Sequence, residues 1–260
     1  MIIQTLTGIL LPFFGTALGA SCVFFMKKNL SRVRFCALNG FAAGVMVAAS
    51  VWSLIIPAIE QSNSLKSFSF LPATVGFWLG IIFLFALGKV ALNLEKRADN
   101  EVISTLKGKK TKMMILAVVI HNVPEGMAVG VVFAGLISGN EGITLAGATS
   151  VSIGIALQNF PEGAIVSMPL SSIGYSKIGS FYYGVLSGAV EPVGALIALT
   201  FAVFIQTLLP YFLGFAAGAM IFVVIKELIP ETAEGGGENI GTLFFCVGFT
   251  VMMVLDVVFG

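Results

Sequence analysis

The chain has 260 residues, of which 57% are hydrophobic and only 10% are charged. A soluble domain carries about 25% charged residues, so this composition cannot cover a water-facing surface and indicates a protein whose outside meets lipid. A formal net charge of +1, without a long basic stretch, excludes a nucleic-acid-binding protein.

Eight apolar stretches follow one another along the chain, each long enough to cross the hydrocarbon core, which takes a helix of about 20 residues. They are 3–25, 37–59, 70–93, 113–137, 143–168, 179–206, 209–229 and 240–259. The runs are continuously apolar and do not alternate, which excludes a transmembrane β-barrel. The sequence therefore predicts an all-α integral membrane protein of eight transmembrane helices, with 1–260 as a single transport domain.

The connections between these stretches differ in charge. Lys and Arg residues gather between the first and second stretches, between the third and fourth, and once between the fifth and sixth, whereas the opposite connections contain only Lys66. The positive-inside rule then predicts a multi-pass protein of the plasma membrane with both termini extracytoplasmic. It also makes 94–112 a cytoplasmic loop. No positive residues precede the first stretch, which argues against a cleaved signal peptide.

The three cysteines offer no metal cluster. Cys22, Cys36 and Cys246 are far apart and form no C-x-x-C pair. Structural zinc sites use paired ligand spacings, so we interpret these cysteines as small buried hydrophobic residues.

An internal repeat relates the two ends of the chain. Gly40 to Met46 reads G-F-A-A-G-V-M, and Gly214 to Met220 reads G-F-A-A-G-A-M. A proline follows each copy, at Pro57 and Pro230. In the predicted topology the two copies run in opposite directions, which is typical of secondary transporters with inverted repeats. The sequence predicts a 3+2+3 arrangement in which helices 1–3 repeat as helices 6–8.

The central pair of helices carries matching polar motifs. One is His121-Asn122-Val123-Pro124-Glu125-Gly126, and the other is Gln158-Asn159-Phe160-Pro161-Glu162-Gly163. Residues four apart share one face of a helix, so His121 lies with Glu125 and Gln158 lies with Glu162. Each proline removes a backbone donor and is expected to kink its helix.

Ionisable residues inside a membrane are costly and therefore mark functional sites. One imidazole, two carboxylates and amide oxygens at mid-depth suit a borderline divalent cation. Glu191 follows in another proline-containing helix, and together with Asn122 and Asn159 it offers a second, oxygen-rich position beside the first. Alternative interpretations are a structural His121 and carboxyl groups that burial keeps protonated. Lys226, Glu227 and Asp256 are interpreted as an ion-pair network rather than as metal ligands.

At these motifs the chain resembles the ZIP (Zrt-/Irt-like) family of metal-ion transporters, in its short prokaryotic branch. The resemblance covers nearly the whole chain and implies a binuclear site. The first position would use Met46, His121, Glu125, Gln158 and Glu162. The second would use Asn122, Glu125, Asn159, Glu162 and Glu191. The resemblance further implies transport of Zn²⁺, and variously Fe²⁺, Mn²⁺, Co²⁺ and Cd²⁺, into the cytoplasm by alternating access with an elevator-like motion.

The chain departs from the family pattern in three places. Many relatives have His at the position of Gln158, and some have Asp at the position of Asn159. The connection 94–112 contains no His or Cys. The first departure is expected to weaken or broaden the preference for zinc, and the second removes a charge from the second position. The third argues against capture of metal or feedback by this loop. The sequence leaves the driving force and a homodimer open.

We predict no enzymatic activity. The alternatives are a proton-coupled transporter of an organic solute and an intramembrane metal hydrolase. A single His in the chain and the lack of H-E-x-x-H argue against the hydrolase.

Overall fold

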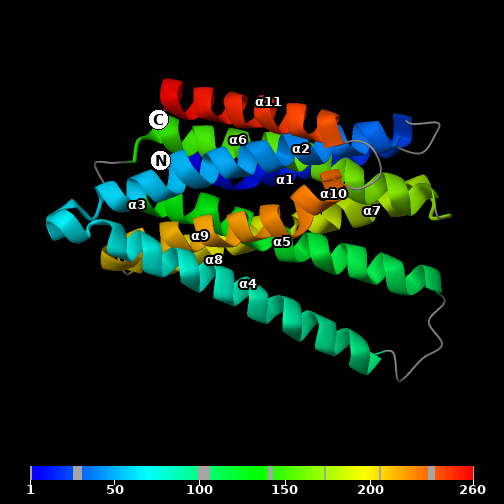
Figure 1. Ribbon diagram of the computed structural model, residues 1–260, viewed down its shortest axis with the longest axis horizontal. Coiled ribbons are helices and arrows are strands. Elements are labelled where there is room, and N and C mark those ends of the chain that lie inside the picture. Colours follow the sequence, from blue (N-terminus) through cyan, green and yellow to red (C-terminus); the bar gives the residue numbers. More distant parts are fainter. Residues whose placement is uncertain are drawn as a thin grey trace.

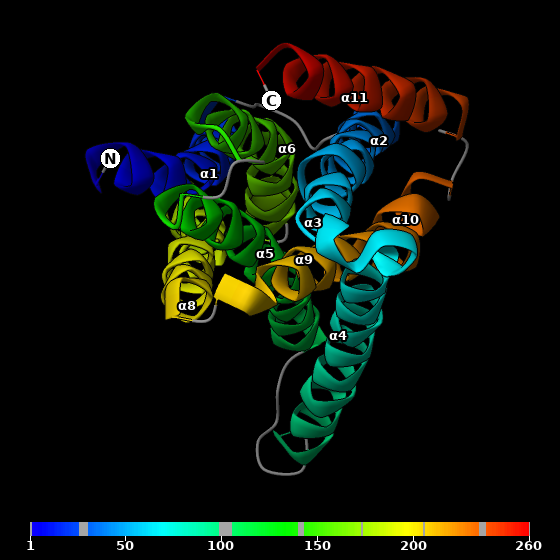
Figure 2. The same ribbon diagram turned by 90° about the vertical axis from the view of Figure 1, so that its left-hand side faces the viewer.

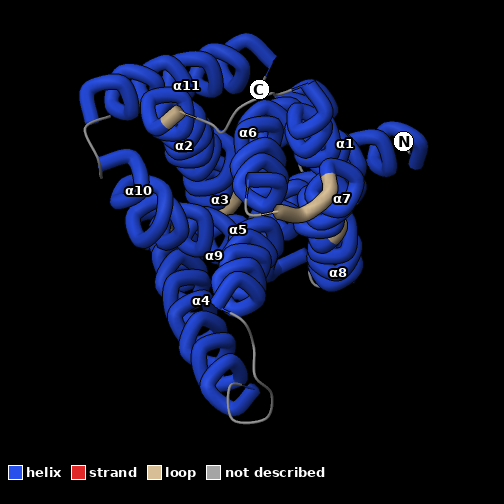
Figure 3. The backbone as a smooth tube through the Cα atoms, turned by 90° about the vertical axis from the view of Figure 1, so that its right-hand side faces the viewer, coloured by secondary structure: helices blue, strands red, loops and turns tan. Residues whose placement is uncertain are grey.

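The structure is a computed structural model, and it describes residues 2–25, 31–98, 106–139, 143–172, 174–204, 206–233 and 238–259. Within these ranges the regular elements are helices, and no strand occurs among them (Figure 3). The prediction of an all-α protein is therefore confirmed for the described part of the chain.

Helical segments coincide with every predicted apolar stretch (Figure 1). In chain order they are α1 (Ile2–Phe25), α2 (Arg32–Ala49), η1 (Ser50–Ile55), α3 (Ile56–Glu60), η2 (Asn63–Phe68), α4 (Phe70–Ala98), α5 (Leu106–Ile137), α6 (Leu145–Ser172), α7 (Lys177–Gly188), α8 (Val190–Phe204), η3 (Gln206–Leu208), α9 (Leu209–Val223), η4 (Val224–Leu228), α10 (Ile229–Ala233) and α11 (Glu238–Phe259).

Among the described residues, six segments are long and apolar enough to cross a membrane. They are Ile2–Phe25, Arg32–Glu60, Phe70–Lys89, Lys177–Phe201, Leu209–Thr232 and Asn239–Val258. In α5 the described apolar part is the shorter segment Asn122–Ile137. The crossing of the membrane by α5 and α6, and with it the 3+2+3 arrangement, stays a prediction.

Apolar side chains cover the outside of the helical bundle, and polar side chains lie inside it. Trp78 and Val257 are 59% and 70% exposed, whereas Glu125 and Glu191 are fully buried. A water-soluble protein has the opposite distribution, because burying a carboxylate away from water is costly. Lipid as the surrounding solvent accounts for both observations.

The predicted connection 94–112 is partly helical. α4 continues to Ala98 and α5 begins at Leu106, while 99–105 lie outside the described residues. Lys, Arg, Glu and Leu are good helix formers, so both helices extend beyond their apolar cores. The cytoplasmic position of this segment stays a prediction.

Two long segments each contain a π-helical turn at matching places. η1 begins at Ser50, four residues after Met46, and η4 begins at Val224, four residues after Met220. The N–H of Ile56 donates to the Val51 carbonyl, and the N–H of Ile229 donates to the Val224 carbonyl. The two copies of the repeated sequence therefore share a local backbone distortion, of a kind that is frequent at functional sites.

The repeated glycines bring pairs of helices into close contact. A Cβ at Gly40 or Gly44 of α2 would overlap the backbone of α11, and a Cβ at Gly214 or Gly218 of α9 would overlap the backbone of α4. α11 accordingly lies along α2, and α4 lies along α9 (Figure 2). Small residues allow this close approach of helices in membrane proteins. The two copies of the G-F-A-A-G sequence thus have the same packing role.

Candidate metal site

Glu125 on α5 and Gln158 on α6 are joined by a direct hydrogen bond. Gln158 Nε2 donates to Glu125 Oε1 over 2.7 Å, and both side chains are fully buried. The two predicted motifs therefore meet inside the bundle. Both helices remain helical through Pro124 and Pro161, so the prolines do not break the elements that carry the site.

Glu191 on α8 accepts hydrogen bonds from three other helices. Thr16 Oγ1 on α1 donates to Oε1 over 2.8 Å, and Asn122 Nδ2 on α5 donates to the same oxygen over 3.1 Å. Asn159 Nδ2 on α6 donates to Oε2 over 2.8 Å. The structure thus brings Glu191 together with Asn122 and Asn159, the pair that the sequence analysis placed beside it.

An interruption of the helix positions Glu191. α7 ends at Gly188 and α8 begins at Val190, and the Ala189 N–H bonds to the Leu186 carbonyl over 3.2 Å. Pro192 has no N–H and cannot donate to the Gly188 carbonyl four residues earlier, so one hydrogen bond of the regular pattern is missing at this turn. Asn122 Nδ2 also donates to the Ser187 carbonyl over 2.9 Å, so α5 is attached next to this interruption.

The glycines that end the two motifs have equivalent packing roles. A Cβ at Gly126 would overlap the Glu191 carbonyl on α8, and a Cβ at Gly163 would overlap the Thr16 carbonyl on α1. The first motif therefore packs against α8 at Glu191, and the second packs against α1 at Thr16. These two contact residues are hydrogen-bonded to each other. Only glycine permits this backbone approach, because any larger residue would separate the helices.

Three further predicted residues have a less direct relation to this group. Met46 on α2 is fully buried in the apolar core. Glu162 on α6 is 8% exposed, and its carboxylate interacts electrostatically with those of Glu125 and Glu191. His121 lies one turn before Glu125 on α5, and its side chain is outside what the structure describes.

Four buried side-chain oxygens of this group have no hydrogen-bond partner in the described part of the chain. They are Asn122 Oδ1, Glu125 Oε2, Gln158 Oε1 and Asn159 Oδ1. Buried polar atoms normally have a partner, so unsatisfied ones call for an explanation. All four belong to residues that the sequence analysis predicted as metal ligands.

Amide and carboxylate oxygens of this kind are ligands for hard and borderline divalent cations. Among the described residues, however, no three His, Cys, Asp or Glu side chains gather into a ready-made metal site. Amides lie between the carboxylates instead, since Gln158 donates to Glu125 while Asn122 and Asn159 donate to Glu191. The group is therefore a buried hydrogen-bonded network of carboxylates and amides.

Sequence reasoning missed Thr16 and Ser187. Thr16 lies in the small-residue stretch Gly15 to Ser21, and a hydroxyl there is common in helix packing. The only available signal was a polar residue near the middle of an apolar helix. Ser187 acts through its backbone carbonyl, for which its side chain gives no signal.

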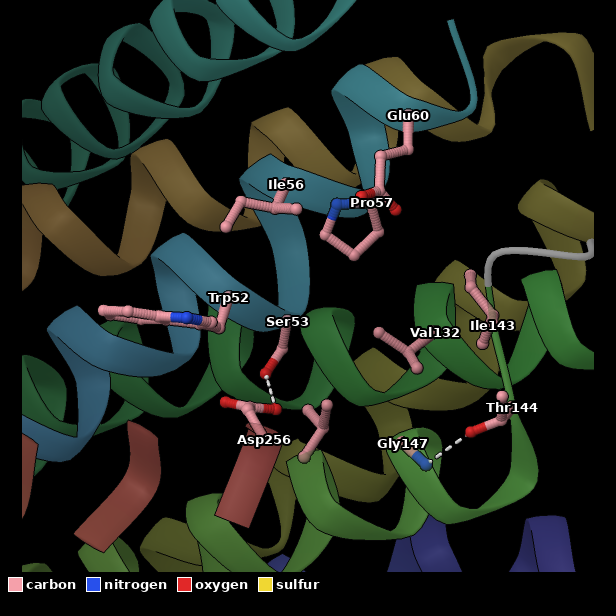
Figure 4. A pocket seen from close by; sticks show the side chains of 11 residues that line it. Trp52, Ser53, Ile56, Pro57, Glu60, Val132, Ile143, Thr144, Gly147 and Asp256 are labelled. Atoms are coloured by element: carbon pink, nitrogen blue, oxygen red, sulfur yellow. Dashed lines mark hydrogen bonds between the residues drawn. The ribbon is translucent and has the colours of Figure 1, made fainter. Parts of the chain in front are cut away.

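A separate cavity of about 220 Å³ lies between α6, α11, the end of α5 and the second half of the α2–α3 segment (Figure 4). Trp52, Val132 and Thr144 are among the residues that line it, together with the carboxylates of Glu60 and Asp256. Ser53 Oγ donates to Asp256 Oδ1 over 2.7 Å, and Asp256 Oδ2 has no hydrogen-bond partner among the described residues. The cavity therefore has an acidic wall.

The contacts described for Lys226 and Asp256 differ from the predicted ion-pair network. Lys226 is exposed on η4, and its Nζ lies 5.1 Å from the ring centroid of Phe222. Asp256 is hydrogen-bonded to Ser53 on η1. The sequence placed these charges inside the membrane but could not indicate the direction in which each side chain points.

Comparison with known proteins matches this chain to one family model and to several proteins, all of them described as zinc transporters. Residues 95–256 match the family model described as ZIP Zinc transporter. The chain is 34% identical to Zinc transporter ZIP11 of Xenopus tropicalis, over 100% of this chain and 98% of that protein. It is 34% identical to Zinc transporter ZIPB of Bordetella bronchiseptica, over 95% of this chain and 79% of that protein. It is 30% identical to Zinc transporter ZupT of Clostridium perfringens, over 94% and 92%.

Proposed function

We propose that this chain, which belongs to the ZIP zinc transporter family, carries Zn²⁺ into the cytoplasm through a site between α5, α6 and α8. The observation that supports this most strongly is the set of four buried oxygens without a hydrogen-bond partner. They come from Asn122, Glu125, Gln158 and Asn159, and an ion would satisfy them. We further propose that the protein transports Fe²⁺, Mn²⁺, Co²⁺ and Cd²⁺ less readily than Zn²⁺.

The proposed site has two positions that share Glu125 and Glu162. Met46, His121 and Gln158 complete the first position, and Asn122, Asn159 and Glu191 complete the second. Two carboxylates balance the charge of a divalent ion, which allows the ion to lie in a low-dielectric interior. The Gln158 amide donates to Glu125 through Nε2, which leaves Oε1 for the ion.

Alternating access is the proposed mechanism of movement. α1, α5, α6, α7 and α8 pack against one another and carry all of the proposed ligands except Met46, while α2 packs on α11 and α9 packs on α4. Contacts of α2 with α6 and of α5 with α9 join these two sets of helices. Two packed sets around one ion site are compatible with a motion of one set against the other, as in other transporters with internal repeats.

The acidic cavity beside Asp256 supports an access route for cations. A cleft lined by one sign of charge raises the local concentration of oppositely charged ions. The cavity lies at the ends of α5 and α11 that the charge distribution of the connections assigns to the extracytoplasmic side. Import across the plasma membrane, with both termini extracytoplasmic, is therefore the proposed direction.

Zinc uptake into proteoliposomes containing a fluorescent zinc indicator tests the proposal. Glu125→Gln and Glu162→Gln keep the shape of the side chains and remove their charges, so each is expected to abolish zinc-dependent fluorescence. Glu60→Gln serves as the matched control, because Glu60 is an exposed carboxylate outside the hydrogen-bonded group. It is expected to keep the maximal rate of the parent. Parental transport by both Glu125→Gln and Glu162→Gln would overturn the proposed site.

A further inference from the structure

Thr16 has an unusual hydrogen bond for a threonine within a helix. A helical threonine commonly returns its hydroxyl to the carbonyl four residues earlier. Thr16 Oγ1 lies 3.4 Å from that carbonyl, on Pro12, but only 2.8 Å from Glu191 Oε1. A hydroxyl has a single proton to donate. The shorter contact therefore commits the Thr16 proton to Glu191, on a helix distant in sequence.

Thr16 is held firmly in this position. A Cβ at Gly163 would overlap its carbonyl, and a Cβ at Gly188 would lie 2.8 Å from its Cβ. α6 and α7 thus pack directly on both the backbone and the side chain of Thr16. The residue is fully buried, so no solvent competes for its hydroxyl.

Donors occupy most of the Glu191 carboxylate. Oε1 accepts from Thr16 and Asn122, and Oε2 accepts from Asn159. A carboxylate offers about four lone-pair positions, of which three are used here, which leaves one for an ion. Glu191 therefore orients its neighbours in addition to the place in the second metal position that we propose for it.

The orientation of the two asparagines follows from this carboxylate together with two backbone carbonyls. Asn122 Nδ2 also donates to the Ser187 carbonyl over 2.9 Å, and Asn159 Nδ2 lies 3.5 Å from the Pro12 carbonyl. The nitrogen and oxygen of an amide point in different directions from one carbon, so fixing Nδ2 on Glu191 turns Oδ1 away from it. Asn122 Oδ1 and Asn159 Oδ1 are both buried and have no hydrogen-bond partner in the described part of the chain. Glu191 therefore presents two amide oxygens from α5 and α6.

We propose that Thr16 is a positioning residue for metal binding, which acts through Glu191 to keep the Asn122 and Asn159 oxygens facing the transported ion. This proposal rests on the proposed function. Without the Thr16 hydroxyl, Glu191 Oε1 loses a donor, and the carboxylate holds Asn122 and Asn159 less firmly. The two amide oxygens are then less well oriented toward the ion, which weakens zinc binding.

The test measures KM and maximal rate of zinc uptake in proteoliposomes. Thr16→Val keeps the side-chain shape without the hydroxyl. Partners that orient metal ligands typically change affinity about 10- to 100-fold, so KM for zinc is expected to rise about tenfold with little change in the maximal rate. Thr16→Ser keeps the hydroxyl and is expected to behave as the parent.

Thr7→Val is the matched control on the same helix. The Thr7 hydroxyl donates to the Ile3 carbonyl of its own helix over 2.8 Å and is exposed, so its removal is expected to leave both readouts unchanged. Should Thr16→Val fold poorly, Thr16→Cys has a similar size and a weak donor, and it is expected to give an intermediate KM.

A double-mutant cycle tests whether Thr16 acts through Glu191. Effects on a shared network are not additive, so Thr16→Val is expected to have no further effect on KM in a Glu191→Gln background. A parental KM in Thr16→Val would overturn the positioning role. An equal defect in Thr16→Ser, or independent multiplication of the effects of Thr16→Val and Glu191→Gln, would overturn it as well. If Glu125→Gln is inactive while Thr16→Val is parental, the positioning role alone is refuted, whereas parental transport by both Glu125→Gln and Glu162→Gln refutes the proposed site itself.

Discussion

Gln158 Nε2 donates to Glu125 Oε1 over 2.7 Å, between two fully buried side chains on different helices. The same amide leaves its oxygen without a hydrogen-bond partner in the described part of the chain. Gln158 thus holds the Glu125 carboxylate with one atom and offers a neutral oxygen with the other. If the ion binds where we propose, Gln158 is the residue at which a substitution is expected to change the choice of metal most directly.

Gln158→His is expected to increase the preference for zinc. Imidazole nitrogen is a better zinc ligand than an amide oxygen, and its other ring nitrogen is able to donate to Glu125 as the amide does. We expect the KM for zinc to fall and the ratio of zinc to manganese uptake to rise about tenfold, in line with ligand effects on affinity. Competition between the two metals in proteoliposomes measures this ratio.

Gln4→His is the control for that substitution, because Gln4 is exposed near the start of α1. It introduces an imidazole outside the hydrogen-bonded group and is expected to leave the metal ratio unchanged. An unchanged ratio in Gln158→His would show that Gln158 does not contact the ion.

Zinc is expected to stabilise the folded protein in detergent. A ligand at about 100 times its Kd adds about 2.7 kcal/mol to the free energy of unfolding of a single site. The melting temperature is therefore expected to rise with zinc and to fall again on adding EDTA. Differential scanning fluorimetry measures both. The double variant Glu125→Gln/Glu162→Gln is expected to lose the zinc response, and its retention would place the binding elsewhere.

Gly126→Ala is expected to impair both packing and transport. The new Cβ would overlap the Glu191 carbonyl, a backbone atom that cannot rotate away. Overpacking of this kind costs about 1–3 kcal/mol, and it would separate α5 from α8 and Glu191 from Asn122. Thermal unfolding and zinc uptake measure the two effects.

Gly88→Ala is the control for this backbone contact. A Cβ there would meet only the end of the flexible Lys226 side chain, at 3.4 Å. Its unfolding temperature and its uptake are expected to match or exceed those of the parent. Equal behaviour of Gly126→Ala and Gly88→Ala would refute the close contact between α5 and α8.

Asp256→Asn is expected to reduce zinc uptake at low metal concentration without lowering the maximal rate. The substitution retains an oxygen for the Ser53 hydrogen bond and removes the charge from the cavity wall. Acidic clefts concentrate cations by about tenfold or more, so we expect KM to rise several-fold. A lower maximal rate with an unchanged KM would contradict an access role.

Much of this fold was predictable because backbone N–H and C=O groups in a membrane have no water to bind, so a continuously apolar segment must satisfy them by forming a helix. The continuous apolar runs required helices, and helices occur at each of them. The prolines also had local consequences, since the helix is interrupted just before Pro192 and π-helical turns precede Pro57 and Pro230. The ends of α4 and α5 were less predictable, because their charged residues form helix as readily as loop.

The candidate site was predictable as a set of residues but not as a set of contacts. The motifs identified Glu125, Gln158 and Glu191 because polar groups in a membrane are costly and therefore functional. Thr16 carries no comparable signal, since a single hydroxyl is common where helices pack. The partners of Asp256 and Lys226 were also beyond prediction, because side chains on one helix can point to several neighbours.

The sequence by itself determined that this chain is a helical membrane protein, that its polar motifs share helix faces, and that its residues match a family of zinc transporters. Composition and spacing are local properties, and they suffice for these conclusions. Only the tertiary structure decided which polar atoms have a hydrogen-bond partner. Hydrogen bonds from Thr16, Asn122 and Asn159 to Glu191 join four helices, and they arise from packing between segments that lie far apart in the chain. That packing turns the amide oxygens toward the place where we propose the ion binds.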